Sequence, residues 1–281
     1  MANEDLIRDY LSPMSPLPTS LTPGGSLVGK IQCIFFDIYG TLFISGSGDI
    51  SVARKSSPLS QQLEHLTHKY DIAKTPQALV TELYEAIETK HRQLRDNGID
   101  YPEIKIDEIW QQILAVEDIH RVRKFAIEYE LIVNPVYPMP NLEALLQACR
   151  QQGLAMGIIS NAQFFTSHLF EWFLNARMEQ LGFDSELIFL SYQLGYAKPS
   201  KALFKMAASA IDAKGFNTTA ALLVGNDMLN DIYPAHHFGF QTALFAGDAR
   251  SLRLRKDESR CRDLSADLIL TDLGQLIDHI T

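Results

Sequence analysis

The sequence predicts an α/β protein with a doubly wound, mostly parallel β-sheet at its core and a helical subdomain inserted after the first strand. Two observations carry this prediction. A short apolar run at residues 31–36 is followed, from residue 140 onward, by further apolar runs that alternate with helical patterns. The stretch from about residue 50 to residue 138 instead shows helical periodicity and no convincing strand pattern.

The first 30 residues precede the predicted sheet. Residues 13–30 (PMSPLPTSLTPGGSLVGK) are rich in Pro, Ser, Thr and Gly, which is typical of an extended arm or linker. Residues 4–11 (EDLIRDYL) fit a short docking helix and a loosely ordered leader about equally well. We therefore expect residues 1–30 to form an arm or linker outside the core.

The predicted strands are short apolar runs, each suited to burial on both faces of a sheet. They are IQCIFF (31–36), LAMGII (154–159), LIFLS (187–191), ALLV (221–224), QTALF (241–245) and DLIL (267–270). Helical patterns lie between most of them. NLEALLQACRQQG (141–153) carries leucines on one face and ends at Gly153, and SKALFKMAASA (200–210) repeats the pattern. Segments 31–45 and 139–281 should together form the sheet core.

Residues 46–138 are expected to form the helical subdomain. Val80, Leu83, Tyr84, Ile87 and Leu94 fall at helical spacing; Ile106, Ile109, Trp110 and Ile113 form a second stripe, and RKFAIEYELIV (123–133) a third. Helices inserted in this way after the first strand of an α/β sheet indicate a separate subdomain.

Composition and charge exclude several classes of function. The net charge is −9 and the pI about 5.4, so nothing favours nucleic acid or an anionic membrane as a partner. No apolar stretch approaches the ~20 residues needed to span a bilayer, and the first residues lack the features of a signal peptide. Cys33, Cys149 and Cys261 are far apart, which disfavours a zinc site and suits a reducing compartment. We expect a cytoplasmic protein; the sequence does not predict its oligomeric state.

Polar residues follow four of the predicted strands, at the sheet edge where open α/β proteins bind ligands. They are Asp37, Tyr39 and Thr41, then Ser160 and Asn161, then Lys198, then Asn226, Asp227, Asn230 and Asp231. A carboxylate at a strand end can act as a nucleophile, and hydroxyls and amides can donate hydrogen bonds to a transferring group. Several carboxylates in one crevice need a bridging cation, and Mg²⁺ prefers such hard oxygen ligands.

These four segments, in this order, resemble the haloacid dehalogenase-like superfamily of hydrolases. FFDIYGTL looks like the first motif of that superfamily, IISNA the second, YAKPSKALF the third and LLVGNDMLNDIYPA the fourth. The resemblance covers nearly everything from residue 31 on. It implies a Rossmann-like core, with residues 46–138 as a type-one helical cap.

The resemblance also implies roles for the residues that match the motifs. Asp37 would be the nucleophile, and the other catalytic candidates are Tyr39, Thr41, Ser160, Asn161 and Lys198. The implied cofactor is Mg²⁺, and its candidate ligands are Asp37, the Tyr39 backbone carbonyl, Asn226, Asp227 and Asp231. Cap residues Tyr84, His91, Arg92, Tyr101 and Trp110 are candidates for lining the substrate entrance.

Two departures from the superfamily pattern divide the functional hypotheses. Its phosphatases have a second Asp where this chain has Tyr39, and the pattern Asp-x-Tyr-Gly-Thr resembles the haloacid dehalogenases instead. A tyrosine with a pKa near ~10 protonates a leaving alkoxide poorly. Asn226 stands where an acidic metal ligand is usual. Those dehalogenases also carry a Trp-Arg pair after the first motif; this chain has no Trp there, and Arg54 is only a weak substitute.

Three functions therefore stay open. We favour Mg²⁺-dependent hydrolysis of a phosphoester on a small, soluble, anionic substrate. Metal-free hydrolysis of a 2-haloacid is the first alternative, and a non-catalytic binding protein on the same scaffold is the second. Taken singly, Asp37 could be a helix cap or turn residue, Asn161 an N-cap and Lys198 a solvated loop residue; their occurrence together favours function.

Overall fold

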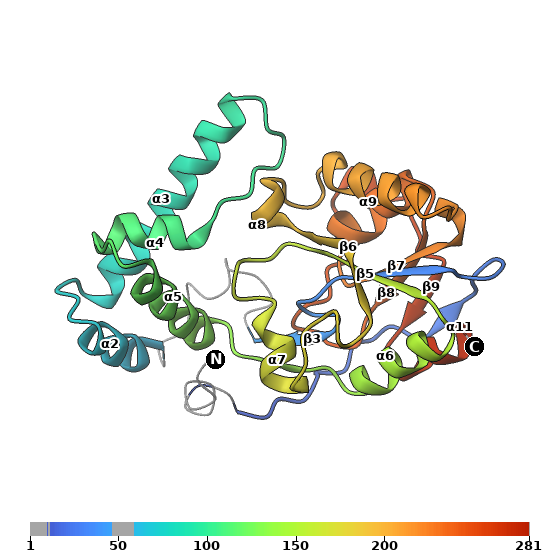
Figure 1. The fold of residues 1–281 in the computed structure, drawn as a ribbon, viewed down its shortest axis with the longest axis horizontal. Helices are drawn as coiled ribbons and strands as arrows, with labels where there is room; N and C mark the ends of the chain where they lie inside the picture. The colour runs from blue at the N-terminus through green and yellow to red at the C-terminus, as the bar shows by residue number, and fades with distance from the viewer. Residues whose placement is uncertain (1–9, 11, 47–58, 281) are drawn as a thin grey trace.

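The computed structural model describes residue 10 and residues 12–46 and 59–280, and its centre is a seven-stranded sheet (Figure 1). The strands are β1 Gly24–Gly25, β2 Cys33–Phe36, β5 Ala155–Ser160, β6 Phe183–Leu190, β7 Ala221–Gly225, β8 Gln241–Phe245 and β9 Leu268–Leu270. Their order is β1-β9-β8-β7-β2-β5-β6, and every pairing is parallel except that of β1 with β9. The predicted mostly parallel sheet is confirmed.

Strand β2 lies at the point where the strand order reverses. The chain passes from β2 to β5 and β6 on one side, then returns to β7, β8 and β9 on the other. In open α/β sheets, a crevice forms beyond the carboxyl ends of the strands at this reversal. The residue that follows β2 is Asp37, so the topology itself brings this carboxylate to the crevice.

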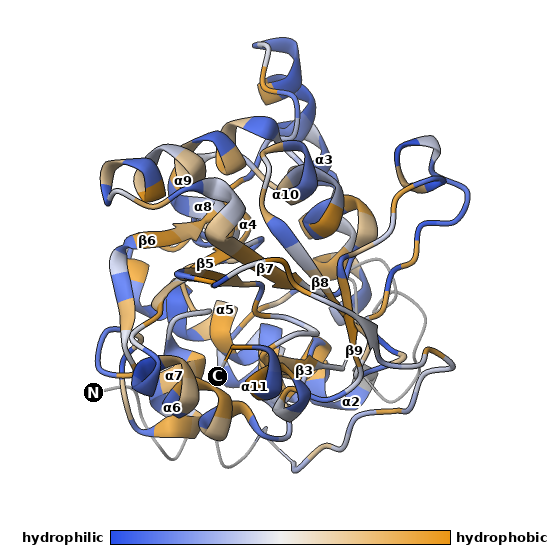
Figure 2. Cartoon of the chain, turned by 90° about the vertical axis from the view of Figure 1, so that its right-hand side faces the viewer, coloured by the Kyte–Doolittle hydropathy of each residue, from blue (hydrophilic) through white to orange (hydrophobic). Residues whose placement is uncertain are grey.

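Helices cover both faces of the sheet (Figure 2). They are α6 Leu142–Gln151, α7 His168–Leu174, α8 Ser191–Leu194, α9 Lys201–Ala213, α10 Tyr233–His237 and α11 Gly274–Ile280. Ile34 and Phe36 of β2 pack in one cluster with α6 and α11, while Cys33 and Phe35 pack in another with α9 and α10. Because side chains alternate across a strand, a fully apolar β2 is what this double burial requires.

The helical subdomain consists of α2 Leu59–Lys69, α3 Pro76–Asp96, α4 Ile106–Leu114 and α5 Ile119–Val133. Three of these were expected from their apolar stripes, and α2 was not. Aromatic packing holds the subdomain together: the Trp110 ring lies 4.9 Å from that of Phe125 and 4.7 Å from that of Tyr129. Helix α3 begins at Thr75 and Pro76, where the Thr75 hydroxyl caps the helix.

The short pieces of structure differ from the sequence prediction. Strands β3 Phe43–Ser45 and β4 Val136–Pro138 pair antiparallel as a separate ribbon where the chain leaves and re-enters the sheet domain. Three-residue strands are too short to show periodicity, and β4 falls inside the stretch where no strand was expected. Strand β6 begins four residues earlier than predicted, because its polar first half carries no apolar run.

Short helical turns complete the fold: η2 Thr218–Ala220, η3 Met228–Ile232 and η4 Ser259–Cys261. Within the described ranges, no helix combines the length and the apolar character that crossing a bilayer requires. The proposed docking helix at residues 4–11 lies outside the described residues, apart from Tyr10.

Candidate active site

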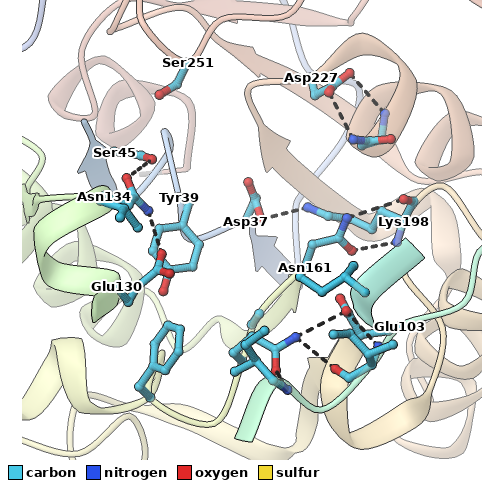
Figure 3. Close-up of a pocket in the computed structure, with 18 of the residues that line it drawn as sticks. Asp37, Tyr39, Ser45, Glu103, Glu130, Asn134, Asn161, Lys198, Asp227 and Ser251 are labelled. Carbon is cyan, nitrogen blue, oxygen red and sulfur yellow. Dashed lines mark hydrogen bonds and ion pairs between the residues drawn. The ribbon is translucent and has the colours of Figure 1, made fainter. Parts of the chain in front are cut away.

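A cavity of about 360 Å³ lies at the carboxyl ends of the central strands, between the sheet domain and the helical subdomain (Figure 3). This volume is within the usual range of small-molecule sites, ~300–1,000 Å³. All the site residues expected from the sequence line the cavity except Thr41 and Ser160. Of the entrance candidates, Tyr84, His91 and Trp110 line it and Arg92 and Tyr101 do not.

Asp37 lies at the floor of the cavity, directly after β2. Its backbone N–H donates to the Val224 carbonyl at 2.9 Å and so continues the sheet ladder by one residue. Lys198 Nζ donates to Asp37 Oδ1 at 2.7 Å, and no partner within the described residues engages Oδ2. The Asp37 residue is 7% exposed, so the carboxylate is shielded from bulk water but borders the cavity.

Lys198 joins two carboxylates. Its ammonium also donates to Asp231 Oδ1 at 2.5 Å and to the Ile159 carbonyl at 3.2 Å. Burial disfavours the charge, but Asp231 and Asp37 together raise the Lys198 pKa well above its usual range. The ammonium is therefore permanently charged at neutral pH, and it holds the two buried carboxylates in one network.

Asn161 positions the chain at Lys198. Its Oδ1 accepts the Lys198 backbone N–H at 2.6 Å, and its Nδ2 lies 3.4 Å from the Lys198 carbonyl. Ser160, the last residue of β5, is fully buried and does not line the cavity. Its hydroxyl makes no hydrogen bond to the part of the chain that the structure describes. Asn161 thus bonds to backbone, whereas Ser160 keeps an unused donor.

The two acids of the segment after β7, Asp227 and Asp231, have different partners. Asp231 Oδ2 accepts the Asp227 backbone N–H at 2.9 Å, and burial raises the Asp231 pKa while Lys198 opposes the rise. The Asp227 carboxylate instead receives the Arg255 guanidinium, with Nη2 2.6 Å from Oδ2, and the backbone N–H of Leu229 at 2.8 Å. Asp227 is thus paired and caps η3, while Asp231 belongs to the Lys198 network.

Asn226 and Thr41 contact each other beside this network. Thr41 Oγ1 donates to Asn226 Oδ1 at 3.2 Å, and Asn226 Nδ2 donates to the Ser251 carbonyl at 2.6 Å. Gly40, which precedes Thr41, has a φ of +81°, and a Cβ on it would overlap the Ser251 side chain. The turn after Asp37 therefore requires glycine for both its conformation and its space.

Tyr39 borders the cavity with its hydroxyl turned away from Asp37. The phenol lies 3.0 Å from Thr166 Oγ1, and in Figure 3 its ring extends toward Glu130 rather than toward the Asp37 carboxylate. Burial raises the Tyr39 pKa above its usual value. Tyr39 is thus a neutral phenol with a hydroxyl partner of its own.

The helical subdomain contributes two acids that the sequence prediction missed. Burial raises the pKa of Glu130, on α5, to about 7, and its Oε1 accepts from Asn134 Nδ2 at 3.1 Å. Burial also raises the pKa of Glu103, whose carboxylate accepts from Ser191 Oγ at 2.7 Å and from the Ile104 N–H at 2.9 Å. Neither acid pairs with a cation among the described residues.

Other cavity residues also escaped the sequence prediction. They are Ser45, Gln163, Ser251, Arg253 and Arg255 from the sheet domain, and Asn134 from the end of α5. Most lie outside the four motifs, and no spacing rule marks them. The polar run ARSLRLRKD after β8 was the available signal for Ser251 and the two arginines, because it follows a strand at the same edge of the sheet. Arg54 lies outside the described residues.

The oxygen atoms at the cavity floor determine which metal ion the site can bind. Within the described ranges, no group of three or more His, Cys, Asp or Glu side chains is placed to hold one. The remaining side-chain donors are hard oxygens, namely the Asp37 Oδ2 atom and the Asn226 amide oxygen, and the family resemblance adds the Tyr39 carbonyl as a candidate. Mg²⁺ commonly takes one or two carboxylates, waters and the phosphate of its substrate. This donor set fits Mg²⁺, with one carboxylate and with phosphate as a co-ligand.

Comparison with known proteins agrees with the geometry. A family model described as haloacid dehalogenase-like hydrolase matches residues 31–239. A glyceraldehyde 3-phosphate phosphatase of Pyrococcus furiosus is 25% identical over 252 residues, which are 89% of this chain and 92% of the relative. A ribulose-1,5-bisphosphate 5-phosphatase of Halopiger xanaduensis is 25% identical over 145 residues; the match spans 51% of this chain and only 56% of that protein.

Solved structures of both enzyme types share the fold. A HAD phosphatase from Thermococcus onnurineus superposes with a TM-score of 0.52 at 16% identity, covering 88% of this chain and 97% of the other. A 2-haloacid dehalogenase from Pseudomonas syringae pv. Tomato DC3000 superposes with a TM-score of 0.54 at 18% identity, covering 89% and 98%. At such identities the likeness concerns the fold alone.

Proposed function

The chain belongs to the haloacid dehalogenase-like hydrolases, and from this premise we propose that it hydrolyses a phosphate monoester of a small molecule with Asp37 as nucleophile. Both curated relatives described above are phosphatases, which supports phosphorus over carbon as the electrophile. The three described cysteines are buried and free, in keeping with action in the reducing cytoplasm.

The observation that carries the proposal is the Asp37–Lys198–Asp231 network. The ammonium holds Asp37 Oδ1 at 2.7 Å, while none of the described residues engages Oδ2, at the edge of the cavity. A carboxylate with one tethered and one free oxygen is oriented for attack by the free oxygen. Asp231 in turn fixes the ammonium from the other side.

We assign the remaining residues of the network to charge and orientation. In the first step Asp37 Oδ2 attacks phosphorus and the ester oxygen departs; Lys198 lowers the repulsion between the incoming phosphate and Asp37. The Ser160 hydroxyl has no hydrogen-bond partner among the described residues, but it is fully buried and does not line the cavity, so we assign it no contact with the phosphate. Thr41 already donates to Asn226, so its part would be to orient that amide oxygen.

Mg²⁺, held by Asp37, the Tyr39 carbonyl and the Asn226 amide oxygen, would neutralise phosphate charge when bound. Asp227 is paired with Arg255 and caps η3, so we assign it no direct ligand role in this arrangement. Asp231 is engaged by Lys198 and the Asp227 N–H, and its part is to anchor the ammonium. In the second step water attacks the phosphoaspartate, and the helical subdomain limits access of bulk water.

A metal-free dehalogenase is the second candidate, and specific observations favour it. The residue two places after Asp37 is a neutral phenol bonded to Thr166, and Asn226 replaces an acidic ligand. Displacement of halide needs no proton donor and no divalent cation. Asp37 would attack carbon, and the same Lys198 network would serve it.

A substrate panel separates these activities. Full-length protein should release phosphate from small monoesters in the presence of Mg²⁺, and EDTA should suppress that release. Asp37→Asn should abolish it, since an amide is a poor nucleophile, without loss of the fold by circular dichroism. Halide release from 2-haloacids that survives EDTA, with no phosphate released from any ester, would establish the second candidate instead. Absence of both activities would favour a binding protein.

A further inference from the structure

The cavity has two chemically different halves, one from each part of the molecule. The half from the sheet domain carries all of the cationic side chains that line the cavity in the described ranges, namely Lys198, Arg253 and Arg255. Asp37, Asp227 and Asp231 accompany them. Formal charges there cancel, and the charged groups are concentrated around the proposed nucleophile.

The half from the helical subdomain is apolar. Its side chains are mainly aliphatic and aromatic: Leu83, Tyr84, Ile87, Trp110, Tyr129 and Val133. Its only charged side chains in the described ranges are those of Glu103 and Glu130, and neither pairs with a cation there. Burial lowers the pKa of His91 in this half, so this ring is neutral at pH 7. Among the described residues of this half, no cation is placed to pair with a second anionic group on a substrate.

In-line attack from Asp37 determines which half receives the leaving group. The nucleophile comes from the sheet domain, and the leaving group departs on the opposite side of phosphorus, toward the helical subdomain. The body of the substrate therefore packs against the apolar half. An aliphatic or aromatic body gains free energy from that burial, whereas the hydroxyls of a sugar would lose hydrogen bonds to water.

The chemistry of the departing oxygen adds a second, independent constraint. Tyr39 stands where phosphatases of the family have a second Asp, and its hydroxyl is engaged by Thr166 Oγ1 at 3.0 Å, so this position supplies no carboxylic acid to protonate the departing oxygen. Glu130 and Glu103 also line the cavity, but their carboxylates accept hydrogen bonds from Asn134 and Ser191, and we assign neither to the departing oxygen. With no proton donor at that oxygen, the P–O bond breaks readily only if the leaving oxygen is a stable anion. A phenol, with a pKa near ~10, meets this condition; an aliphatic alcohol, with a pKa near that of water, ~16, does not.

We propose, on the basis of the phosphatase function above, that the substrate is an aryl monophosphate or a similar ester of an acidic, apolar hydroxyl compound with no second anionic group. The Asp37 Oδ2–P bond forms, the P–O(aryl) bond breaks, and its electron pair leaves on the aryloxide, which takes a proton from solvent. Water then forms a bond to phosphorus, the phosphoaspartate bond breaks, and Asp37 recovers its carboxylate as phosphate departs.

The test compares esters of matched shape on the wild-type protein with Mg²⁺. Phenyl and cyclohexyl phosphate differ little in size but greatly in the acidity of the leaving hydroxyl. We expect kcat/KM to favour phenyl phosphate by at least ~10²-fold, the lower end of what a general acid contributes. 4-Carboxyphenyl phosphate adds a distal anion, which would face unpaired acids, and glyceraldehyde 3-phosphate has a polar aliphatic body, which would face apolar side chains. The kcat/KM of each should therefore be at least ~10-fold below that of phenyl phosphate.

Two variants check that the cavity causes these preferences. Ile87→Lys places a cation in the apolar half and should raise the ratio of 4-carboxyphenyl to phenyl phosphate turnover by ~10-fold. Thr89→Lys adds the same charge at an exposed position of α3 that does not line the cavity, and should leave the ratio unchanged. Tyr39→Asp introduces a carboxyl group and should narrow the gap between phenyl and cyclohexyl phosphate.

The outcomes separate this inference from the proposed function. A kcat/KM for cyclohexyl phosphate within ~10-fold of that for phenyl phosphate would overturn the inference but not the phosphatase activity. In that case, loss of cyclohexyl phosphate turnover in Glu130→Gln would identify Glu130 as the proton donor. Preference for glyceraldehyde 3-phosphate would overturn it as well. Release of phosphate from none of the four esters would instead refute the phosphatase function on which the inference rests.

Discussion

At the scale of single residues, the most consequential feature is one ammonium between two buried carboxylates. Lys198 is 5% exposed and contacts Asp37 and Asp231 at 2.7 and 2.5 Å. A buried pair of this kind adds little net stability over an apolar substitute, but removal of one partner leaves an uncompensated charge. Here the network orients Asp37, and its ammonium compensates the charges of two neighbouring buried carboxylates.

Lys198→Met tests that network. Two carboxylates would face each other without a cation, so we expect the free energy of unfolding to fall by about 3–5 kcal/mol at pH 7. Turnover should fall by at least ~10²-fold, since charge compensation at phosphorus is lost. Lys205→Met, at an exposed position of α9, is the matched control and should change stability by less than ~0.5 kcal/mol. Equal effects of both variants would contradict the role of the network.

Glu130 predicts a pH dependence of stability. Its pKa is raised to about 7 in the folded protein from a usual value of 4.5, mainly by burial. The folded state therefore binds the proton more tightly, and stability is lost as the pH rises from about 4.5 through 7. Chemical denaturation at pH 5 and pH 8 should show that Glu130→Gln removes about 2–3 kcal/mol of this loss.

Glu88→Gln, at an exposed position of α3, is the control for that experiment and should follow the wild-type profile. Burial also raises the pKa of Asp231, but Asp231 is present in every variant compared, so its contribution is common to all of them. A Glu130→Gln protein whose stability fell with pH as steeply as the wild type would show that Glu130 is not the titrating group.

The sequence identified the motif residues but not their partners. Asp37, Lys198 and Asp231 were expected in one site because each follows a parallel strand, and the structure brings them together. Asp227 was expected to be a metal ligand, yet its carboxylate is occupied by Arg255, which lies 28 residues further along the chain. No local pattern reports such a pairing, because it depends on how the loop after β8 folds back.

At the scale of elements, the turn after β2 shows how local conformation supports the site. Gly40 has a φ of +81°, and an added Cβ would lie 2.7 Å from Asn226 Nδ2 as well as against Ser251. The turn therefore combines a left-handed conformation with close packing under the cavity floor. Gly98 offers a comparison, since its φ is +89° and nothing lies within 4 Å of the same added atom.

We expect Gly40→Ala to cost about 3 kcal/mol or more of unfolding free energy, from backbone strain plus overpacking. Gly98→Ala should cost only about 1 kcal/mol, from strain alone. Thermal or denaturant unfolding of both variants measures the difference. Similar losses in the two proteins would show that the contacts of Gly40 with Asn226 and Ser251 are unimportant.

At the scale of the whole molecule, the arm links the two parts of the chain. Strand β1 pairs with β9, and Thr19 Oγ1 donates to the Ala246 carbonyl at 2.8 Å, so the arm follows the edge of the sheet domain. Further back, the Tyr10 hydroxyl donates to Glu128 on α5 of the helical subdomain at 2.7 Å. An arm expected to lie outside the core thus adds a strand to the sheet and contacts the subdomain.

Tyr10→Phe should weaken that link. Loss of a hydrogen bond to a buried carboxylate costs about 1–2 kcal/mol, which corresponds to a fall in Tm of roughly 2–6 °C for a chain of this size. Val28→Ala, at an arm residue that is 80% exposed, should leave Tm within about 1 °C. Differential scanning calorimetry distinguishes them, and an unchanged Tm in Tyr10→Phe would mean that Glu128 is sufficiently held by Lys69 and Tyr70.

The overall architecture was the most predictable level. Six strands, helices α6 and α9 and three helices of the subdomain follow from hydrophobic periodicity, which long buried elements display clearly. Periodicity did not predict three further elements, namely the β3–β4 ribbon, the antiparallel strand β1 and helix α2. Short or exposed elements owe their structure to tertiary contacts rather than to their own sequence pattern. Of the cavity half formed by the helical subdomain, only Tyr84, His91 and Trp110 were among the entrance candidates, since core and cavity-lining residues of a helix look alike in sequence.

The central claim is that the electrophile is phosphorus rather than carbon, and isotope transfer during a single turnover in H₂¹⁸O tests it most directly. If water attacks a phosphoaspartate at phosphorus, the label enters the released phosphate and the peptide that contains Asp37 keeps its mass. If Asp37 had attacked carbon, water would hydrolyse a carboxylic ester at its carbonyl, and one ¹⁸O would remain on Asp37. We predict labelled phosphate and an unlabelled Asp37 peptide by mass spectrometry; a labelled Asp37 would contradict the account.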